Sequence, residues 1–105
     1  MSTLKTGALR GTSGTADSAT LHATDQSVSF LGHVYPDADN TKDLGSSSKR
    51  WANVYVGDMQ LSNEGASNDV DGTWGSYTLQ EGADDLFLIN NRTGKKYKFK
   101  ITEVS

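Results

Sequence analysis

The sequence has no cysteine and only one proline among its 105 residues. Without cysteine the chain has no disulfide, no thiolate metal site and no thiol nucleophile. It has no run of 18 apolar residues either, so we expect no transmembrane helix. The basic residues near its start are not followed by an apolar block, so we expect no secretory signal there.

Large apolar residues are scarce as well. Leu, Ile, Val and Phe together make up 20 of the 105 residues. A chain of this length and composition buries a modest core at best. The net charge of −3 is nevertheless too small to favour full disorder. We therefore expect a folded unit that shares its core with copies of itself.

The pattern of apolar residues predicts strands and no helices. No segment carries apolar residues at helical spacing over three turns. Residues 20–23 and 27–30 alternate polar and apolar side chains, and strand character returns over residues 51–61, where the expected buried positions are Val54, Val56, Met59 and Leu61. In the last third, turn residues separate strands expected at about 74–80, 85–90 and 96–103. The predicted fold is all-β, built from short strands that end in an antiparallel three-stranded meander.

Composition divides the chain near residue 32. Residues 1–32 are rich in Ser, Thr and Gly and contain isolated large apolar residues, among them Leu4, Leu9 and Leu21. We expect this part to be an extended attachment segment that docks on another protein by strand addition. Residues 33–105 are expected to form the β-rich domain. Its strand at Leu86–Ile89 is apolar on both faces, which again requires cover from another subunit or from the first segment.

Charge is unevenly distributed. Residues 1–90 have a net charge of −7, whereas residues 91–105 have a net charge of +4. A basic segment on an acidic body could attract nucleic acid. However, Lys96, Lys98 and Lys100 alternate with apolar residues, so they form the solvent face of a strand. We therefore expect no nucleic-acid partner, and we expect the lysines to discourage unwanted extension of the sheet.

One acidic stretch has part of the spacing of a calcium-binding loop. Its alternating residues are Asp37, Asp39, Thr41 and Asp43. Position six of such a loop would be Lys42 instead of glycine, and position twelve would be Ser48 instead of glutamate. We therefore interpret the stretch as an acidic turn and predict no bound metal.

No pattern typical of catalysis is present. The sequence contains no nucleophile elbow, no phosphate-binding loop and no zinc-protease motif. Glu81 and Asp84 or Asp85 could form a carboxylate pair, but they fall on an expected hairpin turn with no cleft to raise a pKa. His22 and His33 have no carboxylate pair at ligand spacing nearby. We predict a non-enzymatic protein without a cofactor.

Three segments resemble a known family. The run Asp43–Tyr55, with the sequence DLGSSSKRWANVY, is similar to a module that recurs in bacteriophage tail-fibre proteins. Residues 72–82 and 84–97 resemble the C-terminal part of many fibre and virion proteins of marine phages. Together the resemblance extends over residues 36–104.

The resemblance implies a structural protein of a tailed-phage virion that assembles as an intertwined homotrimer. Its partners would then be copies of itself and other virion proteins, and it would be assembled in the host cytoplasm and located on the tail or capsid surface. On this interpretation the apolar residues along the trimer axis are Trp51, Val54, Tyr55, Leu86, Leu88, Tyr97 and Phe99. Asp43, Gly45 and Arg50 would form a turn in which the arginine pairs with the aspartate or with a backbone carbonyl.

An alternative function is recognition of host cell-surface polysaccharide. Trp74 and Tyr77 lie three apart in an expected strand and should point to opposite faces, one into the core and one toward a ligand. The Arg50–Trp51 pair could also offer a stacking surface for a sugar or a base. A structural role, with Trp51 filling a core, is the preferred interpretation of that pair.

Overall fold

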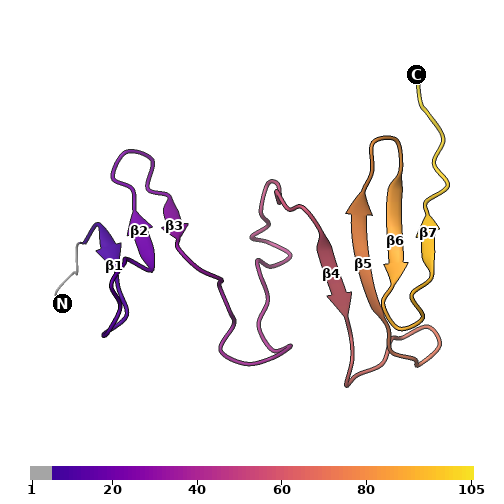
Figure 1. Cartoon of the computed structure of the whole chain (residues 1–105), viewed down its shortest axis with the longest axis horizontal. Coiled ribbons are helices and arrows are strands. Elements are labelled where there is room, and N and C mark those ends of the chain that lie inside the picture. Colours follow the sequence, from indigo (N-terminus) through magenta and orange to yellow (C-terminus); the bar gives the residue numbers. More distant parts are fainter. Residues whose placement is uncertain (1–5) are drawn as a thin grey trace. The chain divides into compact units, whose positions relative to one another are not determined.

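The computed structural model describes residues 6–105, which form seven strands in two antiparallel sheets and no helix (Figure 1). The predicted all-β fold is confirmed. Across the described residues no helix is available to cross a membrane. Leu4, one of the expected attachment residues, lies outside the described part of the chain.

The first sheet has the order β1-β2-β3, with strands at Ala8–Leu9, Ala19–Leu21 and Val28–Phe30. The Arg10 guanidinium contacts the Asp17 carboxylate at 2.6 Å across the first connection. In the second connection, the Asp25 carboxylate accepts hydrogen bonds from the Ser27 backbone N–H and hydroxyl. The segment expected to be extended thus contains a small sheet of its own, because its alternating stretches find partners within it.

The second sheet has the order β4-β5-β6-β7, with strands at Met59–Ser62, Ser76–Glu81, Leu86–Asn90 and Lys96–Lys98. Strands β5, β6 and β7 are the predicted meander, and β4 adds a fourth strand beside β5. Strand β7 ends earlier than predicted. Beyond it, the Phe99 N–H still donates to the Leu86 carbonyl at 3.0 Å, but residues 100–103 have no ladder partner among the described residues.

A glycine in the left-handed region shapes the turn between β6 and β7. Gly94 has φ of 76° and its N–H donates to the Asn90 carbonyl at 2.8 Å. The Asn90 side-chain oxygen accepts the Arg92 backbone N–H at 3.0 Å. Only glycine adopts this backbone conformation without a steric penalty from Cβ.

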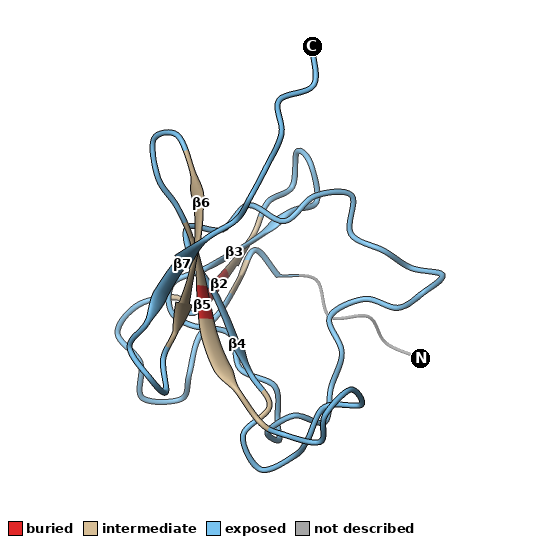
Figure 2. Ribbon diagram, turned by 90° about the vertical axis from the view of Figure 1, so that its right-hand side faces the viewer, coloured by how far each residue is buried: buried red, intermediate tan, exposed pale blue. Residues whose placement is uncertain are grey.

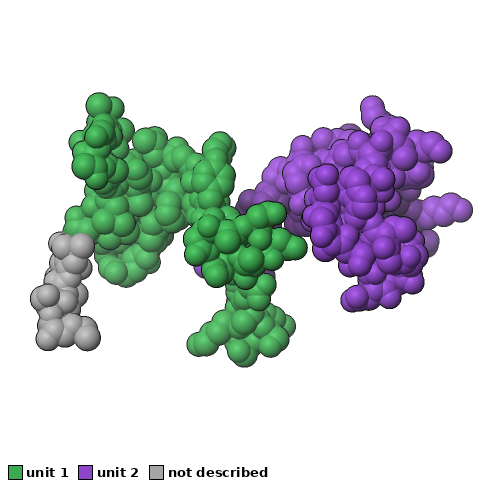
Figure 3. Space-filling model, turned by 90° about the horizontal axis from the view of Figure 1, so that it is seen from below, with its two compact units in different colours: residues 1–50 green, residues 51–105 purple. Residues whose placement is uncertain are grey.

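The chain divides into two compact units, residues 1–50 and residues 51–105 (Figure 3). Composition alone predicts a boundary after residue 32. Residues 33–50 contain no strand and group with the first unit. Each unit holds one of the two sheets.

Very little of the described chain is buried. Within residues 6–105, only Ala19 in β2 and Thr78 in β5 fall into the buried class, each with 6% of its surface exposed (Figure 2). No large side chain of this part is fully enclosed. A single copy therefore leaves most of its apolar side chains in contact with water.

Candidate functional site

One face of the second sheet is apolar. Side chains alternate between the two faces along a strand, and residues directly opposite on neighbouring strands share a face. Met59 lies opposite Leu79, Leu79 opposite Leu88, and Leu88 opposite Tyr97, which makes an apolar row across all four strands. We call this surface the apolar face; its apolar members are Met59, Leu61, Tyr77, Leu79, Leu86, Leu88, Tyr97 and Phe99. Glu81, opposite Leu86, and Asn90, opposite Tyr77, lie on the same side at its two ends.

The apolar face is open to water in a single copy. Leu61 is 50% exposed and Tyr97 48% exposed, and the residues of the two inner strands are half-buried. A hollow of about 260 Å³ lies on it, bordered in part by Leu88, Tyr97 and Phe99. Contiguous apolar surface of this kind is characteristic of an interaction site.

The opposite face is held together by polar side chains. The Thr78 hydroxyl donates to the Gln60 side-chain oxygen at 2.7 Å and accepts from the Asn91 side-chain amide at 3.1 Å. Phe87, Ile89 and the lysines of β7 share this face. The network explains why a threonine is one of the two buried residues, since its hydroxyl is fully satisfied.

The residues expected along the trimer axis fall into two groups. Leu86, Leu88, Tyr97 and Phe99 all belong to the apolar face. Trp51, Val54 and Tyr55 lie in residues 51–58, which form no strand, and they are 64%, 60% and 92% exposed. The strand expected over residues 51–61 begins only at Met59, because the residues before it find no partner strand in the described chain.

The predicted turn before Trp51 is present, but its expected ion pair is not. Gly45 has φ of 87°, and the Ser46 N–H donates to the Lys49 carbonyl at 3.0 Å. Neither ion pair found within residues 6–105 involves Asp43 or Arg50. Backbone bonds and the Ser46 hydroxyl, which accepts the Lys49 N–H at 3.0 Å, close the turn instead.

The carboxylates singled out from the sequence stay apart from any cluster. In the described chain no three His, Cys, Asp or Glu side chains come together as a metal-binding group. Asp37 contacts Lys42 at 3.7 Å. Glu81 and Asp85 flank the turn between β5 and β6, where the Gly82 N–H donates to the Asp85 carbonyl at 2.8 Å.

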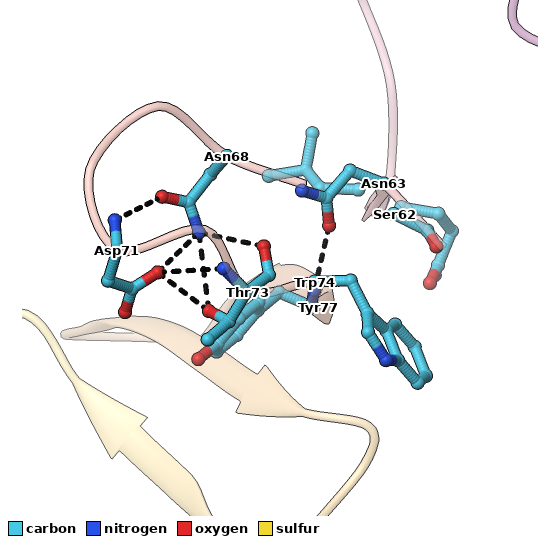
Figure 4. Close-up of a pocket in the computed structure, with 10 residues that line it drawn as sticks. Ser62, Asn63, Asn68, Asp71, Thr73, Trp74 and Tyr77 are labelled. Atoms are coloured by element: carbon cyan, nitrogen blue, oxygen red, sulfur yellow. Dashed lines mark hydrogen bonds between the residues drawn. The ribbon is translucent and has the colours of Figure 1, made fainter. Parts of the chain in front are cut away.

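A groove of about 640 Å³ lies beside the strands β4 and β5. The loop between these strands forms much of it (Figure 4). The residues lining it are Gln60, Leu61, Ser62, Asn63, Asn68, Asp71, Thr73, Trp74, Gly75 and Tyr77. Aromatic rings next to amides and a carboxylate are the groups that proteins use to bind polar, ring-shaped ligands.

Hydrogen bonds within the loop fix the polar side of the groove. The Asp71 carboxylate accepts from the Asn68 amide at 2.7 Å and from the Thr73 hydroxyl at 2.7 Å (Figure 4). The hydroxyl of Thr73, followed by the Asn68 amide and the Thr73 backbone N–H, holds the pKa of Asp71 below its ordinary value. The carboxylate therefore remains ionised over the whole physiological range.

Trp74 and Tyr77 both line this groove with their rings pointing away from each other (Figure 4), but they do not belong to one strand as expected. Strand β5 begins at Ser76, and the alternation therefore does not extend back to Trp74. The Arg92 guanidinium lies 3.8 Å from the centre of the Trp74 ring and donates to the Trp74 carbonyl at 2.9 Å. Asn63 anchors the same corner by accepting the Gly75 N–H at 2.7 Å.

Both aromatic residues are half-buried, and neither belongs to an enclosed core. The sequence offered no signal that Asn63, Asn68 and Asp71 would meet them, since that depends on the path of a thirteen-residue loop, residues 63–75.

Comparison with known protein families, with curated proteins and with solved structures finds no match for this chain.

Proposed function

We propose that the chain is a structural component of a tailed-phage virion, such as a short fibre, a fibre-attachment protein or a decoration protein. It acts by assembling as a homotrimer and by docking to other virion proteins. It needs no catalytic residue and no cofactor for this role. Copies would assemble in the host cytoplasm and reside on the tail or capsid surface.

The observation that carries the proposal is the open apolar face. The second sheet brings eight apolar side chains onto one side, and no other residue of its own unit, residues 51–105, buries them. Covering such a face with the same face of other copies gives each copy the core that it lacks. The resemblance of residues 36–104 to phage fibre modules supports the biological setting and the number three.

Attachment to the rest of the virion is assigned to the first sheet. Leu9 in β1 is 50% exposed, and Leu21 in β2 is half-buried. Strands β1 and β3 are the edges of this sheet, and an edge strand offers backbone groups for strand addition by another protein.

Light scattering after size-exclusion chromatography tests the assembly. We expect a native mass three times the chain mass of 11.3 kDa at micromolar concentration. A folded monomer at that concentration would refute a shared apolar core. Labelling of purified phage particles with an antibody against the chain tests the virion assignment, and particles that stay unlabelled would contradict it.

A second candidate function is binding of host cell-surface polysaccharide, and the groove favours it. Its volume lies within the range of small-molecule sites, and it combines the ionised Asp71 with Trp74, which is not part of the apolar face, and with Tyr77, which the groove and the apolar face share. Sugar rings present C–H groups to aromatic faces and hydroxyls to amides and carboxylates.

The two tryptophans of the chain provide a matched test of this second function. Trp74→Ala should abolish adsorption to polysaccharide and leave the native mass unchanged. Trp51→Ala removes an indole outside the groove and should leave adsorption intact. Loss of the oligomer in Trp74→Ala would instead assign that side chain to the assembly and remove the main support for binding.

A further inference from the structure

The two edges of the second sheet differ in charge. Residues 51–90 contain seven acidic residues and no basic one, whereas residues 91–105 contain five basic residues and one acidic one. Edge strand β4 is flanked by Asp58 and Glu64, and edge strand β7 carries Lys96 and Lys98. The lysines are unopposed, since within residues 6–105 neither ion pair involves them. Each edge therefore has the charge that the other would attract.

The strand directions also match. The sheet has four strands, and each neighbour is antiparallel, so β4 and β7 run in opposite directions. If copies are related by rotation about an axis parallel to the strands, each copy keeps its strand directions along that axis. Strand β7 of one copy then meets β4 of the next as an antiparallel neighbour, and the alternation continues without a break.

We propose that the copies join edge to edge, with β7 of each pairing with β4 of the next, and that Lys98 lies opposite Asp58 of that neighbour. The inference rests on the proposed function, and it names which edges meet. The register follows from the rows of the sheet. Phe87 lies opposite Lys98 and opposite Gln80, whose side-chain amide donates to the Asp58 carboxylate at 3.1 Å.

The row that contains Gln80, Phe87 and Lys98 can be continued across the junction into the next copy without a shift in register. Asp58 of that copy then lies next to Lys98. The adjacent row ends at Tyr97 on one edge and Met59 on the other, so two members of the apolar face also meet across the junction. Directly opposed side chains of opposite charge, and directly opposed apolar ones, each stabilise an antiparallel pair. Both faces of the sheet thus favour the same register.

Charge excludes the other edge pairings. Two β7 edges would bring the lysines of both copies together, and two β4 edges would bring their aspartates together. Like charges directly opposite one another destabilise a sheet. The pairing is therefore head to tail, which forms a ring if the rotation closes.

The dimensions fit three copies. Four strands at their usual spacing make a sheet about 19 Å wide, and three such sheets arranged as a triangle lie about 5.5 Å from the central axis. That distance is close to half of the roughly 10 Å that separates two packed sheets, so the apolar faces would fill the interior. Four copies would place each sheet about 9.5 Å from the axis and leave a hollow centre.

Charge reversal at the two positions provides the test, with assembly followed by light scattering over a dilution series of the full chain. Asp58→Lys and Lys98→Asp should each raise the midpoint concentration of assembly about ten-fold. The double variant Asp58→Lys/Lys98→Asp should return to within about two-fold of the native value, because the pair is restored with its signs exchanged. Within one copy these residues lie on opposite edges, roughly 14 Å apart, so the restoration has to come from contact between copies.

Two further variants control for net charge. Asp69→Lys and Lys49→Asp make the same changes of sign at exposed positions outside the second sheet, and we expect each to move the midpoint by less than two-fold. A zero-length carbodiimide cross-linker supplies a second readout. On an assembly refolded from mixed isotope-labelled and unlabelled chains, it should join Asp58 of one copy to Lys98 of another, identified by mass spectrometry.

The outcomes separate the two proposals. A native chain that remains monomeric refutes the proposed function, and the edge pairing falls with it. A native trimer whose double variant is not restored, and in which no Asp58–Lys98 cross-link joins two copies, refutes the edge pairing and leaves trimeric assembly standing. Restoration together with the mixed-label cross-link establishes the pairing.

Discussion

Leu88 lies at the centre of the apolar row, between Leu79 and Tyr97. Leu88→Ala removes three carbon atoms, which is about 2.4 kcal/mol per copy if they are buried between copies. A trimer contains three such substitutions, so its free energy of assembly falls by about 7 kcal/mol. This loss raises the trimer dissociation constant by a factor of roughly 10⁵. Because the midpoint of trimer formation varies with the square root of that constant, the midpoint concentration should rise about 300-fold.

The neighbouring residue is the matched control. Ile89 lies in the same strand and is also half-buried, but it points to the opposite face. Ile89→Ala should therefore lower the stability of the sheet and move the assembly midpoint by less than about three-fold. Sedimentation equilibrium over a dilution series measures both midpoints. If the two substitutions shift the midpoint equally, or if neither does, the apolar face is not what the copies bury.

Three further predictions concern the sheet and its loops. Thr78→Val should lower the free energy of unfolding by about 1 kcal/mol, because it removes the hydrogen bonds between the Thr78 hydroxyl and the side chains of Gln60 and Asn91. Thr78→Ser should retain most of this free energy, and equal urea midpoints for the two variants would contradict the network. Gly94→Ala should lower the free energy of unfolding in urea by roughly 1–2 kcal/mol, because Gly94 has a φ of 76°. Gly57→Ala should be tolerated, because a Cβ added there has no atom nearby. Equal losses of stability in the two variants would contradict this reasoning. The hydrogen bonds to the Asp71 carboxylate lower its pKa in the folded state, so they stabilise the fold at pH values above the pKa of the unfolded chain. This contribution is lost as the pH falls through the pKa of the folded state. Carboxyl NMR should give a midpoint below the ordinary 3.8, and a midpoint at or above 3.8 would contradict the loop geometry.

The meander could be predicted because its signals are local. Lysines and apolar residues alternate through residues 96–101, and a glycine-containing turn precedes them, so strand and turn are specified by neighbouring residues. Residues 51–58 also have strand character, with Val54, Tyr55 and Val56 in succession, but they do not form a strand. A strand also needs a partner for its backbone, and none is present in the described chain for these residues.

The groove depended on contacts that alternation cannot reveal. Trp74 was expected in a strand, but the bond between Asn63 and the Gly75 N–H fixes the backbone just before β5 and leaves Trp74 outside it. The complete apolar face was hidden for a similar reason. Its row from Met59 to Tyr97 requires the register of β4 against β5, and a long loop separates these two strands in the sequence.

The scarcity of buried residues affects how unfolding of this protein would look in solution. The heat-capacity change and the denaturant dependence of unfolding both scale with the surface newly exposed, and a single copy has little left to expose. An isolated copy should therefore melt over a wide temperature range. A sharp transition would report the dissociation of an assembly, and its temperature would rise with protein concentration.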